Sequence, residues 1–126
     1  LEAAWAQLGE DIDGEAAGDG SGFSVSLSSA GDILAIGAYA NDGNDPGPVR
    51  VFKYSENVWA HLGPDIESDA ADDVSGSVAL SSAGDILAIG AENNNGNGVN
   101  SGHVRVYQYS DNVWNQIGED IHSEAA

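Results

Sequence analysis

The sequence predicts an all-β protein built from tandem repeats, and two observations carry this prediction. The residues LSSAGDILAIGA occupy Leu27–Ala38 and return unchanged at Leu80–Ala91. The rest of each copy consists of short apolar or alternating runs between clusters of Gly, Asn, Asp and Ser, a pattern typical of strands joined by turns. No segment combines sustained helical periodicity with helix caps. We therefore expect a repeated unit of β-strands.

The register of the repeat extends over nearly the whole chain. Val49–Ile66 returns as Val104–Ile121, and a copy of the end of this stretch, WAQLGEDI, opens the chain at Trp5–Ile12. Trp5, Trp59 and Trp114 are therefore equivalent. This pattern is what a piece of a longer array, or a designed unit, would show. The predicted organisation is an outer strand of a partial repeat at 1–12, repeats at 13–66 and 67–121, and the start of a further connector at 122–126.

Four strands are expected in each repeat. Gly22–Ser28 alternates apolar residues with serines, and Ile33–Ala38 is apolar on both faces, as in a strand between two layers. Val49–Tyr54 alternates again and is rich in β-branched and aromatic residues. Val58–Ile66 is the fourth expected strand and carries Trp59. Tight turns are expected at 29–32 and 55–57.

This plan of four short strands joined in order by hairpins is that of a β-propeller blade. A β-solenoid and a sandwich of eight or nine strands are competing architectures. Solenoid rungs are usually much shorter than this repeat, and the near-identity of the copies favours blades over a sandwich. We therefore expect two blades of four antiparallel strands, preceded by one extra N-terminal strand.

The run SGFSVSLSSAGDILAIGA, followed by a loop and VRVFKY, resembles the FG-GAP repeat of integrin-α-type β-propellers, and more closely its shorter variants in repetitive extracellular and microbial proteins. Gly22-Phe23 corresponds to the Phe-Gly element in inverted order. Gly37-Ala38-Tyr39 and Gly90-Ala91-Glu92 correspond to the Gly-Ala-Pro element without its proline. The resemblance implies a propeller and an extracellular location. The calcium loop of the family retains only Asp32 and Asp85 here, so that site is not carried over.

Two blades cannot close a ring, because propellers have about four to eight of them. Unpaired blades would also expose apolar faces, which soluble proteins avoid. We therefore expect the chain to have itself as its partner, in a homo-oligomer whose favoured form is a trimer. Because Trp5–Ile12 duplicates Trp114–Ile121, strand exchange between copies is a further expectation.

The charge of the chain limits its other partners. The sequence has 21 acidic and 3 Lys or Arg residues, a formal net charge of −18. Such a surface repels phosphate backbones and anionic lipid, so neither nucleic acid nor membrane is an expected partner. It attracts divalent cations, although solubility alone also explains it. The absence of Cys excludes disulfides and thiolate metal sites.

Calcium is the cofactor that the acidic residues suggest. Alternate carboxylates at the end of a strand point the same way and can converge on one ion. Ala16 and Ala70 stand where a calcium loop requires Gly, and a solvated acidic connector is the alternative interpretation. The candidate ligands form two series with the same offsets: Asp11, Asp13, Glu15 and Asp19, then Asp65, Glu67, Asp69 and Asp73.

The remaining polar and aromatic residues favour structure over catalysis. A repeated Trp more often packs between blades, with its ring N–H bonded, than stacks on a sugar. Arg50 and Arg105 are equivalent, and each is expected to form an ion pair within its strand face. No nucleophile elbow or phosphate-binding loop is present. Residues outside the repeat pattern, which an enzyme would gather in one place, are scattered: Phe23, Lys53, His61 and His103.

The sequence therefore predicts a non-enzymatic propeller fragment that serves as a scaffold for binding or adhesion, with no catalytic residues and no required cofactor. The alternative is a calcium-dependent or carbohydrate-binding module that uses the acidic loops between blades. An enzyme domain is a further alternative, which the scatter of the non-repeated residues disfavours.

Overall fold

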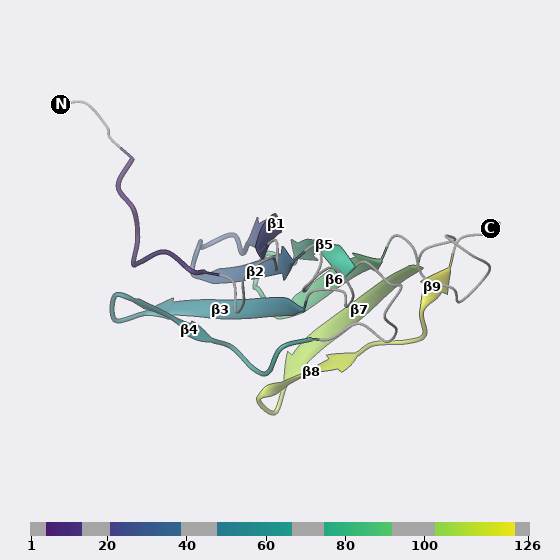
Figure 1. The fold of residues 1–126 in the computed structure, drawn as a ribbon. Coiled ribbons are helices and arrows are strands. Elements are labelled where there is room, and N and C mark those ends of the chain that lie inside the picture. The colour runs from purple at the N-terminus through teal and green to yellow at the C-terminus, as the bar shows by residue number, and fades with distance from the viewer. Residues whose placement is uncertain (1–4, 14–20, 39–47, 67–74, 92–102, 123–126) are drawn as a thin grey trace.

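The computed structural model describes residues 5–13, 21–38, 48–66, 75–91 and 103–122. Within these ranges every regular element is a β-strand, and the strands form two antiparallel sheets (Figure 1). The all-β prediction is confirmed for this part of the chain. No helix long and apolar enough to cross a membrane occurs in it.

Each repeat forms one sheet in which the strands pair in chain order. The first sheet has the order β1-β2-β3-β4 and the second the order β5-β6-β7-β8, with β9 also paired to β7. The expected first three strands of each repeat are confirmed to within a residue or two. The strands of the first sheet are β1 (Ser21–Leu27), β2 (Ile33–Ala38), β3 (Val49–Ser55) and β4 (Val58–His61). Those of the second are β5 (Ser75–Leu80), β6 (Ile86–Ala91), β7 (His103–Ser110), β8 (Val113–Gln116) and β9 (Ile121–His122).

The turn between β1 and β2 explains the letters SSAGD of the repeat. The Ser28 hydroxyl accepts a hydrogen bond from the Ile33 amide at 3.1 Å and donates one to Asp32 Oδ1 at 3.1 Å. Gly31 provides the left-handed backbone that the turn needs, with φ of 80°. The Asp32 carboxylate therefore holds the turn. The same bonds recur in the second copy among Ser81, Asp85 and Ile86.

The turns between β3 and β4 and between β7 and β8 have two central residues each, both with positive φ. The values are 53° and 70° for Glu56 and Asn57, and 56° and 70° for Asp111 and Asn112. Two left-handed residues in a two-residue hairpin match the right-handed twist of the flanking strands. Asn and Asp tolerate this conformation better than Glu does.

The prediction of one continuous fourth strand over Val58–Ile66 is wrong. β4 ends at His61, Gly63 adopts φ of 80°, and Ile66 returns to pair with Val49 as an isolated bridge. In the second repeat, β8 ends at Gln116 and β9 pairs with the beginning of β7, at His103 and Val104. The left-handed glycine interrupts the ladder in each copy, because a strand cannot continue through that backbone conformation.

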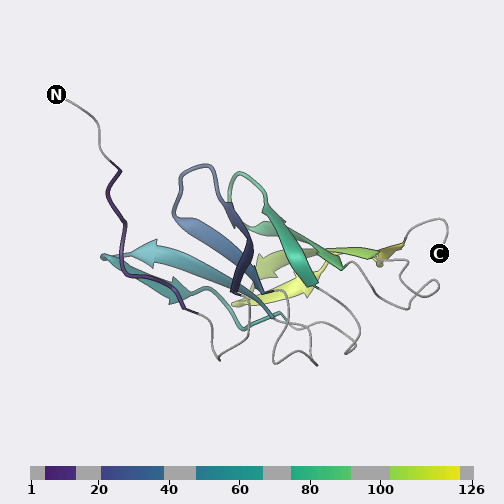
Figure 2. The ribbon, with the colours of Figure 1, turned by 45° about the horizontal axis from the view of Figure 1, so that its top comes forward.

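The extra N-terminal strand is also not observed, since residues 5–13 form no strand. Their counterparts at 59–66 and 114–121 pair with the third strand of their own repeat. Within the described part of the chain, residues 5–13 form no such ladder with a third strand. Figures 1 and 2 show it beside the β3–β4 hairpin, at the end of the molecule opposite to β9.

The core lies between the two sheets, which pack face to face. Strands β1 and β5 lie side by side (Figure 2), where the hydroxyls of Ser24 and Ser26 accept the Val78 and Leu80 amides at 3.1 and 3.0 Å. Each sheet contributes one face to the core. The first sheet provides Ala35, Val49 and Val51, and the second provides Val78, Leu87, Ile89 and Trp114.

Phe23 has no counterpart in the second repeat, and it falls in an irregular part of β1. The pairing of β1 with β2 shifts register between Ser21 and Ser24, a stretch that contains Phe23. The corresponding shift in β5, between Ser75 and Ser77, is one residue shorter. A β-bulge therefore absorbs the length difference, which leaves the rest of both sheets equivalent.

Candidate functional site

The residues that follow β4 pack on Trp114 of the second sheet. The Trp114 indole N–H donates to the Leu62 carbonyl oxygen at 2.9 Å. A methyl group added at Gly63 would lie 3.0 Å from Tyr109 and 3.1 Å from Trp114, so the chain passes close over these two rings. The rings of Tyr109 and Trp114 pack against each other with centroids 5.1 Å apart. The predicted packing role, with a bonded ring N–H, is confirmed for Trp114.

Tyr54 and Trp59 form the equivalent pair of rings on the first sheet. We call this pair the seat of the first sheet, and residues 5–13 lie on it. The Trp59 indole N–H donates to the Leu8 carbonyl oxygen at 2.8 Å. A methyl group at Gly9 would lie 2.8 Å from Trp59 Cδ1 and 3.3 Å from Tyr54. Because Leu8 and Gly9 are the counterparts of Leu62 and Gly63, the N-terminal segment lies where the end of a preceding repeat would lie. Trp5, the equivalent of Trp59 and Trp114, is fully exposed.

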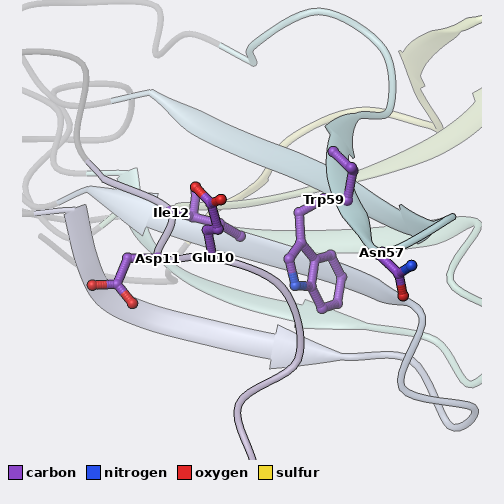
Figure 3. A pocket seen from close by; sticks show the side chains of 6 residues that line it. Glu10, Asp11, Ile12, Asn57 and Trp59 are labelled. Atoms are coloured by element: carbon purple, nitrogen blue, oxygen red, sulfur yellow. The ribbon is translucent and has the colours of Figure 1, made fainter.

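A pocket of about 290 Å³ opens between this segment and the β3–β4 turn (Figure 3). Its walls combine an indole ring, an amide and two carboxylates, which are groups that bind sugars or cations. The indole N–H of Trp59 is already engaged by Leu8, so only the ring itself is available there. The lining residues are Glu10, Asp11, Ile12, Asn57, Val58 and Trp59.

Three of the eight predicted calcium ligands lie in the described residues. Asp11 accepts a hydrogen bond from Gln7 Nε2 at 2.7 Å, Asp65 lies 3.7 Å from His61 Nδ1, and Asp13 is exposed. Across the described ranges, no three His, Asp or Glu side chains gather as metal ligands. Calcium binding therefore stays a prediction. The other five candidates lie outside the described residues: Glu15, Asp19, Glu67, Asp69 and Asp73.

Arg105 forms an ion pair, as predicted, but its partner Asp120 lies between β8 and β9 and not on a strand face. Its Nε and Nη2 atoms donate to the two carboxylate oxygens of Asp120 at 2.8 and 2.9 Å, and Gln116 donates to the same carboxylate at 2.7 Å. This two-pronged contact ties the segment after β8 to strand β7. Arg50, the counterpart of Arg105, is buried with its guanidinium 5.3 Å from the centre of the Phe52 ring.

The face of the first sheet that points away from the core is open. Ser24 and Ser26 point toward the second sheet, so Val25 and Leu27 point away from it. Val25 is 59% exposed, whereas its counterpart Val78 is 9% exposed in the core. Leu27 is exposed in the same way, whereas its counterpart Leu80 packs against the core. We call Val25 and Leu27 the first open face.

The face of the second sheet that points away from the core is open too. Val104 is 38% exposed, whereas its counterpart Val49 is fully buried. Ile117 and Ile121 are exposed, whereas their counterparts pack against the core. We call Val104, Ile117 and Ile121 the second open face. The counterparts of the last two residues are Leu62 and Ile66.

Glycines with positive φ also have close neighbours at one copy of a position and none at the other. An added methyl at Gly63 would meet Trp114, and one at Gly84 would meet Ile33 across the core at 3.0 Å. The counterparts Gly118 and Gly31 have nothing within 4 Å of an added methyl. The space beside these glycines is therefore filled at one copy of the position and open at the other.

A scan against protein-family models found no match, and a search of curated proteins found no similar sequence. The open faces were not among the residues singled out from the sequence. The repeat itself holds the signal, since it pairs each of these exposed residues with a counterpart that is packed between the two sheets.

Proposed function

We propose that the chain is a non-enzymatic structural scaffold, two blades of an FG-GAP-like β-propeller that associates with further copies of itself. The observation that supports this proposal is the relation between the two open faces. The residues of the second open face are the counterparts of residues with which the first sheet contacts the core. The residues of the first open face are the counterparts of residues with which the second sheet contacts the core. Two copies placed head to tail would therefore repeat the internal junction between them.

The chemistry of the two faces fits this association. Val104 faces outward where Val49 is buried, and Val25 faces outward where Val78 is buried, so the junction would again bury valine against valine. A head-to-tail contact leaves one face open at each end until the ring closes. Three copies would provide six blades, within the range of about four to eight that propellers have. The closed ring would serve binding or adhesion through its loops.

The proposed association is tested by measuring the molar mass in solution, by light scattering on a sizing column over a range of concentrations. We expect a discrete oligomer near three times the 12.9 kDa chain. The variant Val104→Asp is expected to lower that mass, because it places a charge in the proposed junction. Its control is Val113→Asp, since Val113 is 39% exposed and its counterpart Val58 is exposed too. A monomer at every concentration, or equal effects of both variants, would contradict the proposal.

The pocket at Trp59 supports a second candidate, a module that binds carbohydrate or calcium. Two carboxylates, an amide and an indole ring line it. Calcium bound to the native state would raise the melting temperature, whereas the scaffold alone predicts the same value in calcium chloride and in chelator. Binding of neutral oligosaccharides on a glycan array, lost in Asn57→Ala, would favour the carbohydrate function. No binding in either assay leaves the scaffold proposal in place.

A further inference from the structure

The seat on the first sheet has two segments that fit it. Leu8-Gly9 occupies it within the chain, and Ile117-Gly118 is the equivalent pair at the end of β8. The three segments of this kind share their backbone conformation, with φ of 76° at Gly9, 80° at Gly63 and 71° at Gly118. Ile117-Gly118 is therefore already shaped to lie on a Tyr–Trp pair.

A head-to-tail contact would bring both segments to one seat. If the second sheet of one copy packs on the first sheet of the next, its Ile117-Gly118 reaches Tyr54 and Trp59 as Leu62-Gly63 reaches Tyr109 and Trp114. The Trp59 indole N–H, as a single donor, can serve only one carbonyl oxygen at this short distance. One of the two segments must therefore leave.

The segment after β8 is held more firmly than the N-terminal segment. The Ile117 amide donates to the Val106 carbonyl oxygen at 2.7 Å, and Asp120 binds Arg105 through both carboxylate oxygens. Residues 5–13 form no strand, and Leu8 and Asp11 are exposed. The N-terminal segment therefore loses less when it detaches.

We infer that, in the proposed assembly, Ile117 and Gly118 of one copy displace Leu8 and Gly9 from the Tyr54–Trp59 pair of the next copy. This inference rests on the proposed function and names the contact that forms the junction. The N-terminal segment then acts as an internal cap, which covers the seat in the isolated chain and competes with the incoming copy. Association is weakened by the cost of removing this cap.

Two glycine variants test the displacement, because their backbone strain is similar and their packing differs. Gly9→Ala places a methyl 2.8 Å from Trp59 in the capped chain, so it should expel the cap and tighten association. Gly118→Ala places a methyl in open space in the isolated chain but against the rings of the next copy after docking. We expect the dissociation constant, measured by sedimentation, to fall severalfold for Gly9→Ala and to rise about tenfold for Gly118→Ala.

Other variants separate the possible outcomes. Ile117→Ser, at an exposed position, should weaken association without unfolding the chain, which keeps the test decisive if Gly118→Ala folds poorly. Trp5→Ala should leave association unchanged, since the displaced segment takes no part in the junction. If Trp5→Ala weakens association and Ile117→Ser does not, the N-terminal segment inserts into the neighbouring copy, and the inference fails while the scaffold proposal stands. A wild-type chain that never associates overturns both.

Discussion

The indole N–H of Trp114 reaches the carbonyl oxygen of Leu62, 52 residues earlier in the chain, at 2.9 Å. This bond joins the two sheets, because Trp114 lies on β8 and Leu62 follows β4. Its counterpart, from Trp59 to Leu8, joins the first sheet to a segment that is not part of any sheet. The bond of Trp114 therefore connects the two packed sheets, whereas the bond of Trp59 holds only residues 5–13.

Replacement of each tryptophan by phenylalanine should reveal this difference. Trp114→Phe leaves the Leu62 carbonyl without its donor between packed sheets, and we expect the free energy of unfolding to fall by about 1–3 kcal/mol. Trp59→Phe should lower it by less than about 0.5 kcal/mol, because residues 5–13 can detach while the sheets stay folded. Urea unfolding followed by circular dichroism measures both values. Equal losses would show that the N-terminal segment is part of the cooperative fold.

The pair of Arg105 and Asp120 should matter for stability more than the surface acids do. Asp120→Asn removes the charge that faces a largely buried guanidinium, and we expect a loss of about 1–3 kcal/mol in the free energy of unfolding. The control is Asp111→Asn in the exposed β7–β8 turn, where Asn tolerates the left-handed backbone and should be neutral. Urea titration of the two variants side by side is the measurement. A neutral Asp120→Asn would mean that the pair adds no net stability.

Glu56 occupies a left-handed position that suits other residues better. Its φ is 53°, where a side chain with a Cβ is strained, and its counterpart is Asp111 with φ of 56°. Glu56→Gly should raise the free energy of unfolding by about 1 kcal/mol. Glu56→Ala keeps the Cβ and should give no such gain. Thermal unfolding by calorimetry compares the two, and a gain for both variants would point to relief of acidic repulsion instead.

The serine contacts between β1 and β5 predict a variant with stronger association. Ser24 and Ser26 accept two amides of the second sheet, and their counterparts on the second sheet are Ser77 and Ala79. A junction between copies would therefore lack one of the two hydroxyls. Ala79→Ser restores it, and we expect the dissociation constant to fall about fivefold, equivalent to one net hydrogen bond of about 1 kcal/mol.

The matched control for this variant is Ala60→Ser on β4, an exposed position with no role in the proposed junction. Sedimentation of both variants with the wild type gives the comparison. If Ala79→Ser leaves the dissociation constant unchanged, the copies do not meet with β1 beside β5 as the internal sheets do.

Association should also strengthen with salt. Each copy carries a formal charge of −18, so copies repel each other at low ionic strength. The repulsion is screened over about 10 Å at 0.1 M salt and over about 3 Å at 1 M. We expect the dissociation constant to fall steadily as sodium chloride is raised. A constant that rises with salt would indicate a junction held by opposite charges, unlike the apolar faces described above.

The first three strands of each repeat, their order and the turns between them could be predicted from the sequence. Each of these depends on neighbours along the chain: Ser28, Gly31 and Asp32 close their own turn, and Glu56-Asn57 sets its own hairpin. The hydrogen-bonded packing of Trp114 and the ion pair of Arg105 could also be predicted, because a buried indole N–H needs an acceptor and an arginine in so acidic a chain meets a carboxylate.

At several positions the packing of the two sheets determines which copy of a residue is covered. Val25 and Val78 lie in nearly the same local sequence, yet one is exposed and the other is buried, because only Val78 packs against the other sheet. Residues 5–13 likewise form no strand, although their sequence nearly repeats that of the segment that forms β4. Local sequence cannot encode these outcomes, since burial and strand pairing depend on what lies across the interface.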